Sequence, residues 1–396
     1  MNKVISYISV VVVLVTVLVF LAWVSSEDPK HNPASFEEAP FEVGIRPLPE
    51  AITLAQYSDK GNLVTLLVES NSGDHVSGID LADLGAVSSD NPFEVLRAVE
   101  ADQLELAFNS DLPRKKVSVT ALSPAGPPGN RHIGIGTNFP EHAEEALSDS
   151  VFNFPKFGTA TPARSTISAP VNGLLDYEVE LCMRFDRPIE TLADFDAASK
   201  GIFLCADFTD RIALLELADF DNLDSGYGFS DAKSGDGFFP TGPLLVIPID
   251  WSKFVADTRM MTLMNGEPRQ DARGREMILN FRELTAKVLD DMDKRRFYFQ
   301  GEYYKLAPNP RIDQDMALMS GTSEGVIFTP PARHDYIEIG LSYFANGGPL
   351  TGKSLIEFAI PLFIENERES DHFLKSGDTV TYQATGLGDI KVLVGE

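Results

Sequence analysis

The chain has 396 residues, 43% of them hydrophobic and 23% charged, so it can bury one large core or a small domain beside a larger one. This composition excludes disordered and collagen-like proteins. Its 33 basic and 59 acidic residues give a formal net charge of −26, which argues against nucleic acid as a partner. The two cysteines, Cys182 and Cys205, fit neither a disulfide scaffold nor a zinc or Cys-x-x-Cys motif. Any bound metal must therefore use oxygen or histidine ligands.

The first apolar segment covers residues 4–24 and reads VISYISVVVVLVTVLVFLAWV, without one charged residue. As a helix it would span a bilayer core, and it is longer than the apolar region of most secretory signals. We therefore expect residues 1–26 to be an uncleaved transmembrane anchor, with a removed signal peptide as the alternative. Lys3 precedes the segment while Glu27 and Asp28 follow it, which predicts a cytoplasmic N-terminus. The expected localisation is a single-pass membrane protein whose remaining residues lie on the periplasmic or extracytoplasmic side.

A tether and a small domain are predicted next. Residues 27–40 lack apolar periodicity and indicate the tether, and residues 41–125 are expected to form a small β-rich N-terminal domain. Within it, residues 52–57 and 63–68 flank a glycine-containing loop, which is typical of a β-hairpin. Asn91-Pro92, followed by apolar residues at helical spacing, predicts one short helix.

The larger domain is predicted to begin at the run Ser-Pro-Ala-Gly-Pro-Pro-Gly at 123–129, which interrupts any periodic structure. Residues 126–396 then read as many short strands with few helices, which favours an α+β, mainly β fold over a doubly wound sheet. Helical spacing occurs only at 142–147, 189–198 and 279–289. The predicted strands cover residues 133–135, 177–183, 202–207, 244–247, 317–319, 326–328 and 379–384.

Three acidic residues are the candidate metal ligands. In an extended strand Glu178 and Glu180 share one face with their Cα atoms about 7 Å apart, close enough to hold one hard cation. Asp207 ends another hydrophobic strand, where an unpaired carboxylate would be costly to bury. Such a set suits Mg²⁺, Mn²⁺ or Ca²⁺ better than zinc. The alternative for Glu178 and Glu180 is the polar edge of a half-buried strand.

His142 and Glu145 are the candidate water-activating pair. The chain passes here from a strand through a turn into a helix, and helical spacing sets the two side chains on neighbouring turns. A carboxylate that orients an imidazole is a common arrangement for a general base. Taken alone, His142 is better explained as an ordinary helix residue.

Together these segments resemble the fumarylacetoacetate hydrolase family over roughly residues 130–394. The resemblance rests on an ordered series of motifs: Gly-x-Asn-Phe-x-x-His-Ala-x-Glu at 136–145, Phe-Pro-Lys-Phe at 154–157, Asp-Tyr-Glu-Val-Glu-Leu at 176–181, Ala-Asp-Phe-Thr-Asp-Arg at 206–211, Lys-Ser-Gly-Asp-Gly-Phe at 233–238, Pro-Thr-Gly-Pro at 240–243, Asn-Gly-Glu-Pro-Arg-Gln at 265–270, Gly-Thr-Ser-Glu-Gly-Val at 321–326 and Leu-Lys-Ser-Gly-Asp at 374–378.

The resemblance implies a mixed β-sandwich roll and a homodimer. It implies the following site: Glu178, Glu180 and Asp207 on Mg²⁺ or Mn²⁺; His142, Glu145 and Lys233 in catalysis; Arg211, Gly321 and Thr322 at the substrate. The implied reaction is hydrolytic cleavage of a C–C bond in a small β-dicarbonyl or 2-oxo acid, such as an acylpyruvate. A cation would stabilise the enolate that this cleavage leaves. Decarboxylation or isomerisation at the same site, or a noncatalytic envelope ligand-binding domain, are the alternatives.

Several features depart from the family pattern. Leu214 stands where a glutamine often follows the arginine, and Ser323 stands where a proline usually follows the Gly-Thr pair. Residues 290–315 and 329–372 are longer than is typical, and we expect them to reshape the mouth of the site or to contact another subunit. Cys182 and Cys205 lie two residues from proposed ligands; we expect small buried apolar side chains, with a disulfide as the alternative if the domain is exported.

Overall fold

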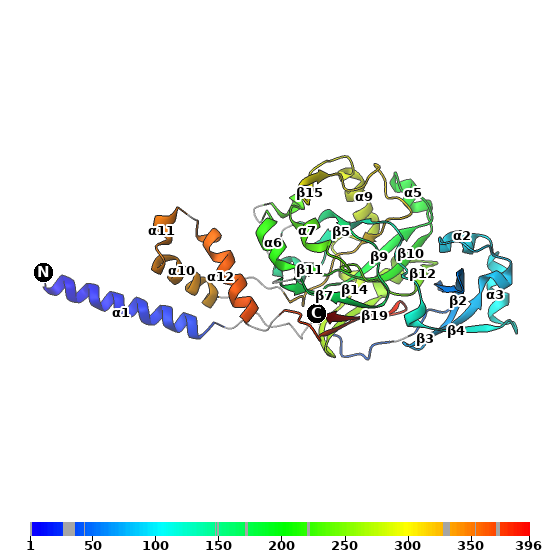
Figure 1. Cartoon of the computed structure of the whole chain (residues 1–396), viewed down its shortest axis with the longest axis horizontal. Helices are drawn as coiled ribbons and strands as arrows, with labels where there is room; N and C mark the ends of the chain where they lie inside the picture. Colours follow the sequence, from blue (N-terminus) through cyan, green and yellow to red (C-terminus); the bar gives the residue numbers. More distant parts are fainter. Residues whose placement is uncertain are drawn as a thin grey trace. The chain divides into compact units, whose positions relative to one another are not determined.

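The chain forms two compact units in a computed structural model, and each unit is described by itself. The smaller unit contains residues 1–32 and 327–373, and the larger contains residues 33–326 and 374–396 (Figure 1). Residues 27–35 of the predicted tether lie outside the described residues. The structure describes residues 2–26, 36–42, 44–146, 148, 150–170, 173–219, 222–327, 333–352, 354–369 and 373–396.

The smaller unit is helical in its described residues. Its helices are α1 (Asn2–Val24), α10 (Arg333–Ala345), α11 (Gly348–Thr351) and α12 (Leu355–Glu369). The Nε1 of Trp23 donates to Glu338 at 2.7 Å, and the backbone N–H of His334 donates to the hydroxyl of Ser26 at 3.1 Å. The long segment predicted at 329–372 therefore supplies helices that pack with the first helix of the chain.

The membrane predictions need correction. Among the described residues, no helix combines the length and the apolar character that a bilayer crossing requires. A crossing takes about 20 consecutive apolar residues. The predicted transmembrane anchor is therefore unsupported, and the predicted localisation is wrong.

A ten-stranded sheet forms the centre of the larger unit. The hairpin predicted at its N-terminal side is confirmed. Its strands β1 and β2 are joined at Lys60-Gly61, and both of these residues have positive φ. Tight hairpin turns that match the twist of their strands require this conformation. Strand β1 pairs in turn with β12, so the N-terminal strands continue the sheet of the larger domain. The strand order is β4 (Arg114–Ser118), β3 (His75–Asp80), β2 (Asn62–Asn71), β1 (Ala51–Asp59), β12 (Leu245–Pro248), β10 (Lys200–Ala206), β9 (Val179–Phe185), β17 (Leu318–Met319), β5 (Arg131–Gly136) and β6 (Phe152–Phe157).

A five-stranded sheet and two short strand pairs complete the β-structure of the larger unit. The sheet has the order β14 (Glu267–Arg273), β13 (Arg259–Met264), β18 (Thr379–Ala384), β19 (Gly388–Gly395) and β7 (Arg164–Ser168). The pairs are β8 (Leu175–Asp176) with β11 (Thr209–Asp210), and β15 (Phe297–Phe299) with β16 (Glu302–Tyr304). The predicted α+β, mainly β fold is confirmed.

Short helices surround these sheets. Asn91 caps the first of them as predicted, because its side chain accepts from the backbone N–H of Phe93. The α-helices are α2 (Pro92–Arg97), α3 (Ala101–Phe108), α4 (Pro140–Glu145), α5 (Leu192–Ala197), α6 (Arg211–Leu217), α7 (Phe229–Lys233), α8 (Trp251–Asp257) and α9 (Phe281–Asp291). Short 3₁₀ turns are η2 (Leu81–Leu84), η3 (Val119–Ala121), η4 (Leu223–Ser225) and η5 (Gly274–Glu276).

Two predicted segments have a different outcome. Val326 and Ile327 are irregular instead of extended, and Phe328 lies outside the described residues. The long segment at 290–315 contains the β15–β16 hairpin, which packs on strand β6 through the stacked rings of Phe157 and Phe299, 4.1 Å apart.

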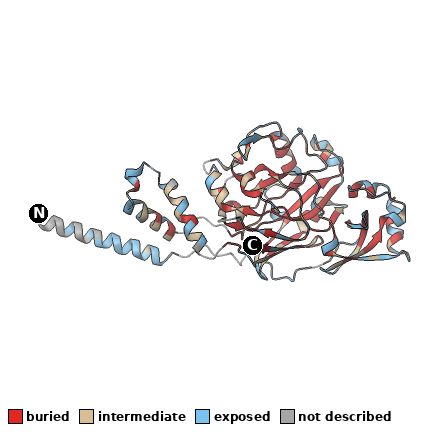
Figure 2. Cartoon of the chain, in the orientation of Figure 1, coloured by how far each residue is buried: buried red, intermediate tan, exposed pale blue. Residues whose placement is uncertain are grey.

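Strands β9 and β10 occupy the middle of the large sheet and are buried along their whole length (Figure 2). A strand that is buried on both faces must be apolar throughout, unless its polar side chains have partners. The polar residues at the ends of these two strands therefore need hydrogen-bond or ion-pair partners.

Candidate functional site

The three predicted metal ligands meet at one end of the β9–β10 pair. Register places Cys205 opposite Glu180, and the backbone N–H of Asp207 donates to the carbonyl of Glu178 at 3.0 Å. Alternate residues of a strand share a face, so Glu178, Glu180 and Asp207 point the same way. Each offers an oxygen within 4.8 Å of the other two, and all three side chains are buried. The structure thus brings together the predicted carboxylates.

Lys233, the last residue of α7, bridges two of these carboxylates. Its Nζ lies 2.5 Å from Glu178 Oε2 and 3.0 Å from Asp207 Oδ2, and it donates to the hydroxyl of Thr209 at 2.8 Å. Burial alone would lower the pKa of Lys233, but the charges of Asp207 and Glu178 outweigh it and raise the pKa. Lys233 is therefore a buried ammonium within the cluster.

Arg211, implied at the substrate by the family resemblance, is a second cation of the cluster. It donates through Nη2 to Glu178 Oε1 and through Nε to Asp176 Oδ2, both at 2.8 Å. Strand β11 pairs with β8 here, with Thr209 opposite Asp176, and this pairing brings Arg211 to Asp176. In this structure Arg211 orients a carboxylate of the cluster. Leu214, where relatives often have glutamine, is buried in α6.

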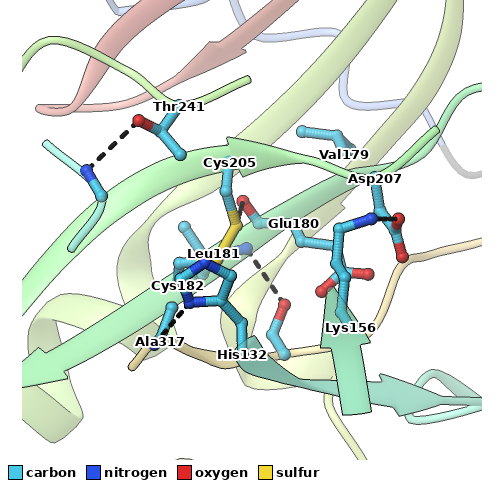
Figure 3. Close-up of a disulfide and its surroundings, with 12 residues drawn as sticks. His132, Lys156, Val179, Glu180, Leu181, Cys182, Cys205, Asp207, Thr241 and Ala317 are labelled. Atoms are coloured by element: carbon cyan, nitrogen blue, oxygen red, sulfur yellow. Dashed lines mark hydrogen bonds and ion pairs between the residues drawn. A yellow bond between two sulfur atoms is a disulfide. The ribbon is translucent and has the colours of Figure 1, made fainter. Parts of the chain in front are cut away.

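Lys156 is a third buried cation, and the sequence analysis assigned it no role. Its Nζ donates to Asp207 Oδ1 at 2.5 Å and also to the backbone carbonyl of Lys233, and its side chain is fully buried (Figure 3). Burial lowers the pKa of Lys156, against the opposing charge of Asp207. The only sequence signal was the lysine within Phe-Pro-Lys-Phe at 154–157, a polar residue in an aromatic strand.

Glu180 differs from its two neighbours because it makes no ion pair with any residue that the structure describes. Its Oε2 accepts the backbone N–H of Gly321 at 2.9 Å. Burial, and then the charges of Asp207 and Glu178, raise its pKa well above the usual value. For Glu178, burial acts in the same direction, but Lys233, Arg211 and His142 together outweigh it and lower the pKa to about 2.

This donor set fits a divalent cation. Three buried carboxylates share a small volume, and the pKa of one of them, Glu180, is raised by burial and then by the negative charge of the other two. Asp207 Oδ2 accepts no hydrogen bond from the described residues. Carboxylate oxygens are the ligands that Mg²⁺, Mn²⁺ and Ca²⁺ prefer, and a 2+ ion would offset the repulsion. The structure supports a possible acidic metal site, without specifying which metal.

The predicted pair His142 and Glu145 lies on the short helix α4. His142 Nδ1 is 3.3 Å from Glu145 Oε2, and Glu145 Oε1 accepts the backbone N–H of Gly325 at 3.1 Å. The charge of His142 is among the causes that lower the pKa of Glu178, after the charges of Lys233 and Arg211. Asn138 fixes the turn before the helix by donating to the carbonyls of Ser320 and Leu279.

The loop that carries Gly321 and Thr322 is a support for strand β9. Gly321 has a φ of 78°, which a side chain would strain, and its N–H holds Glu180. The Thr322 hydroxyl donates to the carbonyl of Val179 and accepts from Gln270 Nε2, each at 2.9 Å. Gln270 was missed as a site residue, although it ends the motif Asn-Gly-Glu-Pro-Arg-Gln. Its Oε1 also accepts the N–H of Val179 at 3.1 Å.

Comparison with known proteins identifies the family. The family model described as "Fumarylacetoacetate (FAA) hydrolase C-terminal" matches residues 131–394. The chain belongs to the fumarylacetoacetate hydrolase family. A curated relative, 2,4-didehydro-3-deoxy-L-rhamnonate hydrolase from Sphingomonas sp. (strain SKA58), is 27% identical over 261 residues, which are 62% of this chain and 77% of that protein.

Solved structures show the same fold. Fumarylacetoacetate hydrolase from Exiguobacterium antarcticum superposes with a TM-score of 0.52 at 18% identity, covering 87% of this chain and 99% of its own. The 2-hydroxyhepta-2,4-diene-1,7-dioate isomerase from Mycobacterium marinum gives a TM-score of 0.51 at 15% identity, covering 87% and 98%. At such identities the likeness concerns the fold alone.

Proposed function

We propose that this protein is a metal-dependent hydrolase that cleaves a C–C bond in a small β-dicarbonyl or 2-oxo acid. The observation that carries the proposal is the convergence of Glu178, Glu180 and Asp207, all buried, beside the His142–Glu145 pair. Similarity to a relative named as a hydrolase of a didehydro-deoxy sugar acid supports hydrolysis and a small acidic substrate.

The three carboxylates would hold Mg²⁺ or Mn²⁺, with Ca²⁺ as a further candidate. A cation bound there supplies Lewis-acid stabilisation of the negative charge that develops on the substrate oxygens. Lys233 presents a buried ammonium beside the same carboxylates and can donate a hydrogen bond to that developing charge. Arg211 holds Glu178 in place, and Thr322 holds strand β9 through Val179.

His142 takes the role of general base. With its Nδ1–H donated to Glu145, the Nε2 is the basic nitrogen that accepts a proton from water. The water oxygen bonds to one carbonyl carbon, the bond between that carbon and the next breaks, and the bonding electrons remain on the departing enolate. The proton held by His142 then returns to the enolate carbon. Glu145, fixed by the Gly325 N–H, stabilises the imidazolium between these transfers.

The test follows the loss of acylpyruvate absorbance by the full-length, EDTA-treated protein after Mg²⁺ or Mn²⁺ is restored. We expect turnover that disappears with EDTA and with Glu178→Ala, and that falls strongly in His142→Ala. Unchanged turnover after either of the first two treatments would contradict the metal role.

Oxaloacetate separates this reaction from decarboxylation, because decarboxylation needs no attacking water. A His142→Ala protein that hydrolyses nothing but still releases CO₂ would favour a decarboxylase. Cation binding without turnover on a broad panel of oxo acids would favour a noncatalytic binding domain.

A further inference from the structure

Cys182 and Cys205 form a disulfide between the two strands that carry the carboxylates (Figure 3). The sequence analysis favoured two separate buried thiols, but the structure joins them, with their Cα atoms 5.9 Å apart. The link is diagonal, because the strand register places Cys182 opposite Phe203 and Cys205 opposite Glu180.

This cross-link lies on the same strand face as the candidate ligands. Residues two apart in a strand share a face, so Cys182 follows Glu180 along β9 and Cys205 precedes Asp207 along β10. Cys205 is also the direct cross-strand neighbour of Glu180. The disulfide therefore joins the two strands one residue pair away from the carboxylate cluster.

Backbone hydrogen bonds also restrain this end of the strand pair. The N–H of Asp207 donates to the carbonyl of Glu178 at 3.0 Å, and the N–H of Ala206 donates to the carbonyl of Pro240 at 2.9 Å. The disulfide adds a covalent link to these contacts. The three carboxylates offer oxygens within 4.8 Å of one another, and repulsion between like charges acts to separate the ends of the strands.

The sulfur atoms are enclosed by the protein core. Both cysteines have no exposed surface and belong to a buried cluster that includes Phe239, Ala317 and Met319. Solvent and reductants do not reach such a bond in the folded protein, so its role is a permanent restraint instead of a switch.

We propose that the Cys182–Cys205 disulfide is a positioning cross-link for the metal site: it fixes Glu180 relative to Asp207 and so strengthens cation binding. This inference rests on the proposed function only in assuming that the carboxylate cluster binds a divalent cation. Supports of metal ligands typically change affinity by about 10–100-fold, and we expect a loss of that size without the disulfide.

The experiment compares wild type with the double variant Cys182→Ala/Cys205→Ala in the full-length protein. Mn²⁺ affinity is measured by titration calorimetry on metal-free protein, well below the melting temperature, and melting is recorded separately. The matched control is Leu67→Ala, which removes a side chain of the same buried cluster on strand β2, away from the carboxylates. Both changes should lower the melting temperature, but only the double variant should bind Mn²⁺ about 10–100-fold more weakly.

Three results would overturn the inference. Mass spectrometry could find two free thiols in the native protein, or the double variant could bind Mn²⁺ within twofold of wild type. If wild type binds no Mn²⁺, the metal part of the proposed function fails together with the inference. If wild type binds Mn²⁺ and the double variant binds it equally well, only the inference fails. Should the double variant not fold, wild type refolded in a phosphine reductant, with its thiols counted, replaces it.

Discussion

The two halves of the candidate site are held in very different ways. The side chains of Glu178 and Asp207 are 5% and 1% exposed, lie next to the ends of central strands β9 and β10 and contact buried cations. His142 and Glu145 are 13% and 28% exposed and lie on the six-residue helix α4, joined by one 3.3 Å contact. The comparison suggests that the carboxylate half is rigid before any ligand binds, whereas the base half is adjustable. The two halves should therefore fail independently when they are mutated.

The largest expected effect comes from Glu180→Gln, which attacks the rigid half. The variant keeps the shape of the side chain but removes one ligand charge, so we expect Mn²⁺ binding to weaken by at least about 100-fold and kcat/KM to fall by roughly 10³-fold. Because one of three mutually repelling carboxylates is gone, the metal-free protein should melt no lower than wild type. Calorimetric titration and melting curves with and without Mn²⁺ check both points. Glu105→Gln, on the exposed surface of α3, is the control, and near-normal Mn²⁺ affinity in Glu180→Gln would remove Glu180 from the ligand set.

Next in size is His142→Gln, which attacks the adjustable half. Loss of a general base typically costs about 10²–10⁴-fold in rate, and we expect kcat on an acylpyruvate to fall within that range. Mn²⁺ affinity should change by less than about threefold, because the ring is not among the ligands and the carboxylates keep their own partners. His75→Gln, on strand β3, is the control. If Mn²⁺ affinity fell together with the rate, the two halves would be one coupled unit and the comparison would be wrong.

Lys156→Met tests why the carboxylate half is rigid. Removing one partner of a buried ion pair leaves an uncompensated charge, so the metal-free variant should lose about 3 kcal/mol of unfolding free energy. Added Mn²⁺ should restore part of it, since the cation would compensate Asp207. Lys115→Met is the matched control: it breaks the partly exposed pair with Asp80 and should cost less than about 1 kcal/mol. Urea unfolding of both variants measures the loss of unfolding free energy. Equal losses would show that the Lys156–Asp207 pair contributes no more than the partly exposed Lys115–Asp80 pair.

Lys156 also shows where sequence reasoning stops. Alternation and burial cost were enough to predict a mainly β fold and to single out Glu178, Glu180 and Asp207, because those signals are local. The partner of Lys156 is fixed by tertiary contact between β6 and the end of β10, which no local pattern encodes.

Register explains the other differences from expectation. The family resemblance implied that Arg211 contacts the substrate; in the structure the β8–β11 pairing brings it to Asp176, to which its Nε donates. The disulfide likewise depends on a diagonal relation across β9 and β10 that spacing alone does not reveal. The family resemblance implied that Thr322 contacts the substrate; in the structure its hydroxyl donates to the carbonyl of Val179 in β9. The motifs therefore predicted which residues gather at the site more accurately than they predicted the contacts of each residue.

The smallest predicted effect concerns His132, on strand β5 beside the rigid half (Figure 3). Its Nδ1 accepts the backbone N–H of Ala317 at 3.1 Å, so the ring is neutral and its Nε2–H donates to the carbonyl of Gly158 at 3.0 Å. Burial, followed by the charge of Lys156, lowers the pKa of His132 from 6.5 to about 3.

The sign of the pH effect follows from this lowered pKa. Below pH 6.5 His132 binds a proton in the unfolded chain but stays neutral in the folded protein. The stability contributed by a neutral His132 is therefore present above pH 6.5 and is lost as the pH falls toward 3. Between pH 7 and pH 5 the loss should be about 2 kcal/mol. Many carboxylates also titrate with acid, so the measurement is the difference between wild type and His132→Gln in urea unfolding at both pH values. The variant cannot take up this proton, and its stability should fall by about 2 kcal/mol less than that of wild type. Parallel pH dependences in the two proteins would mean that His132 takes up its proton at the same pH in the folded and unfolded states, and that the interior behind the carboxylates is less rigid than the comparison requires.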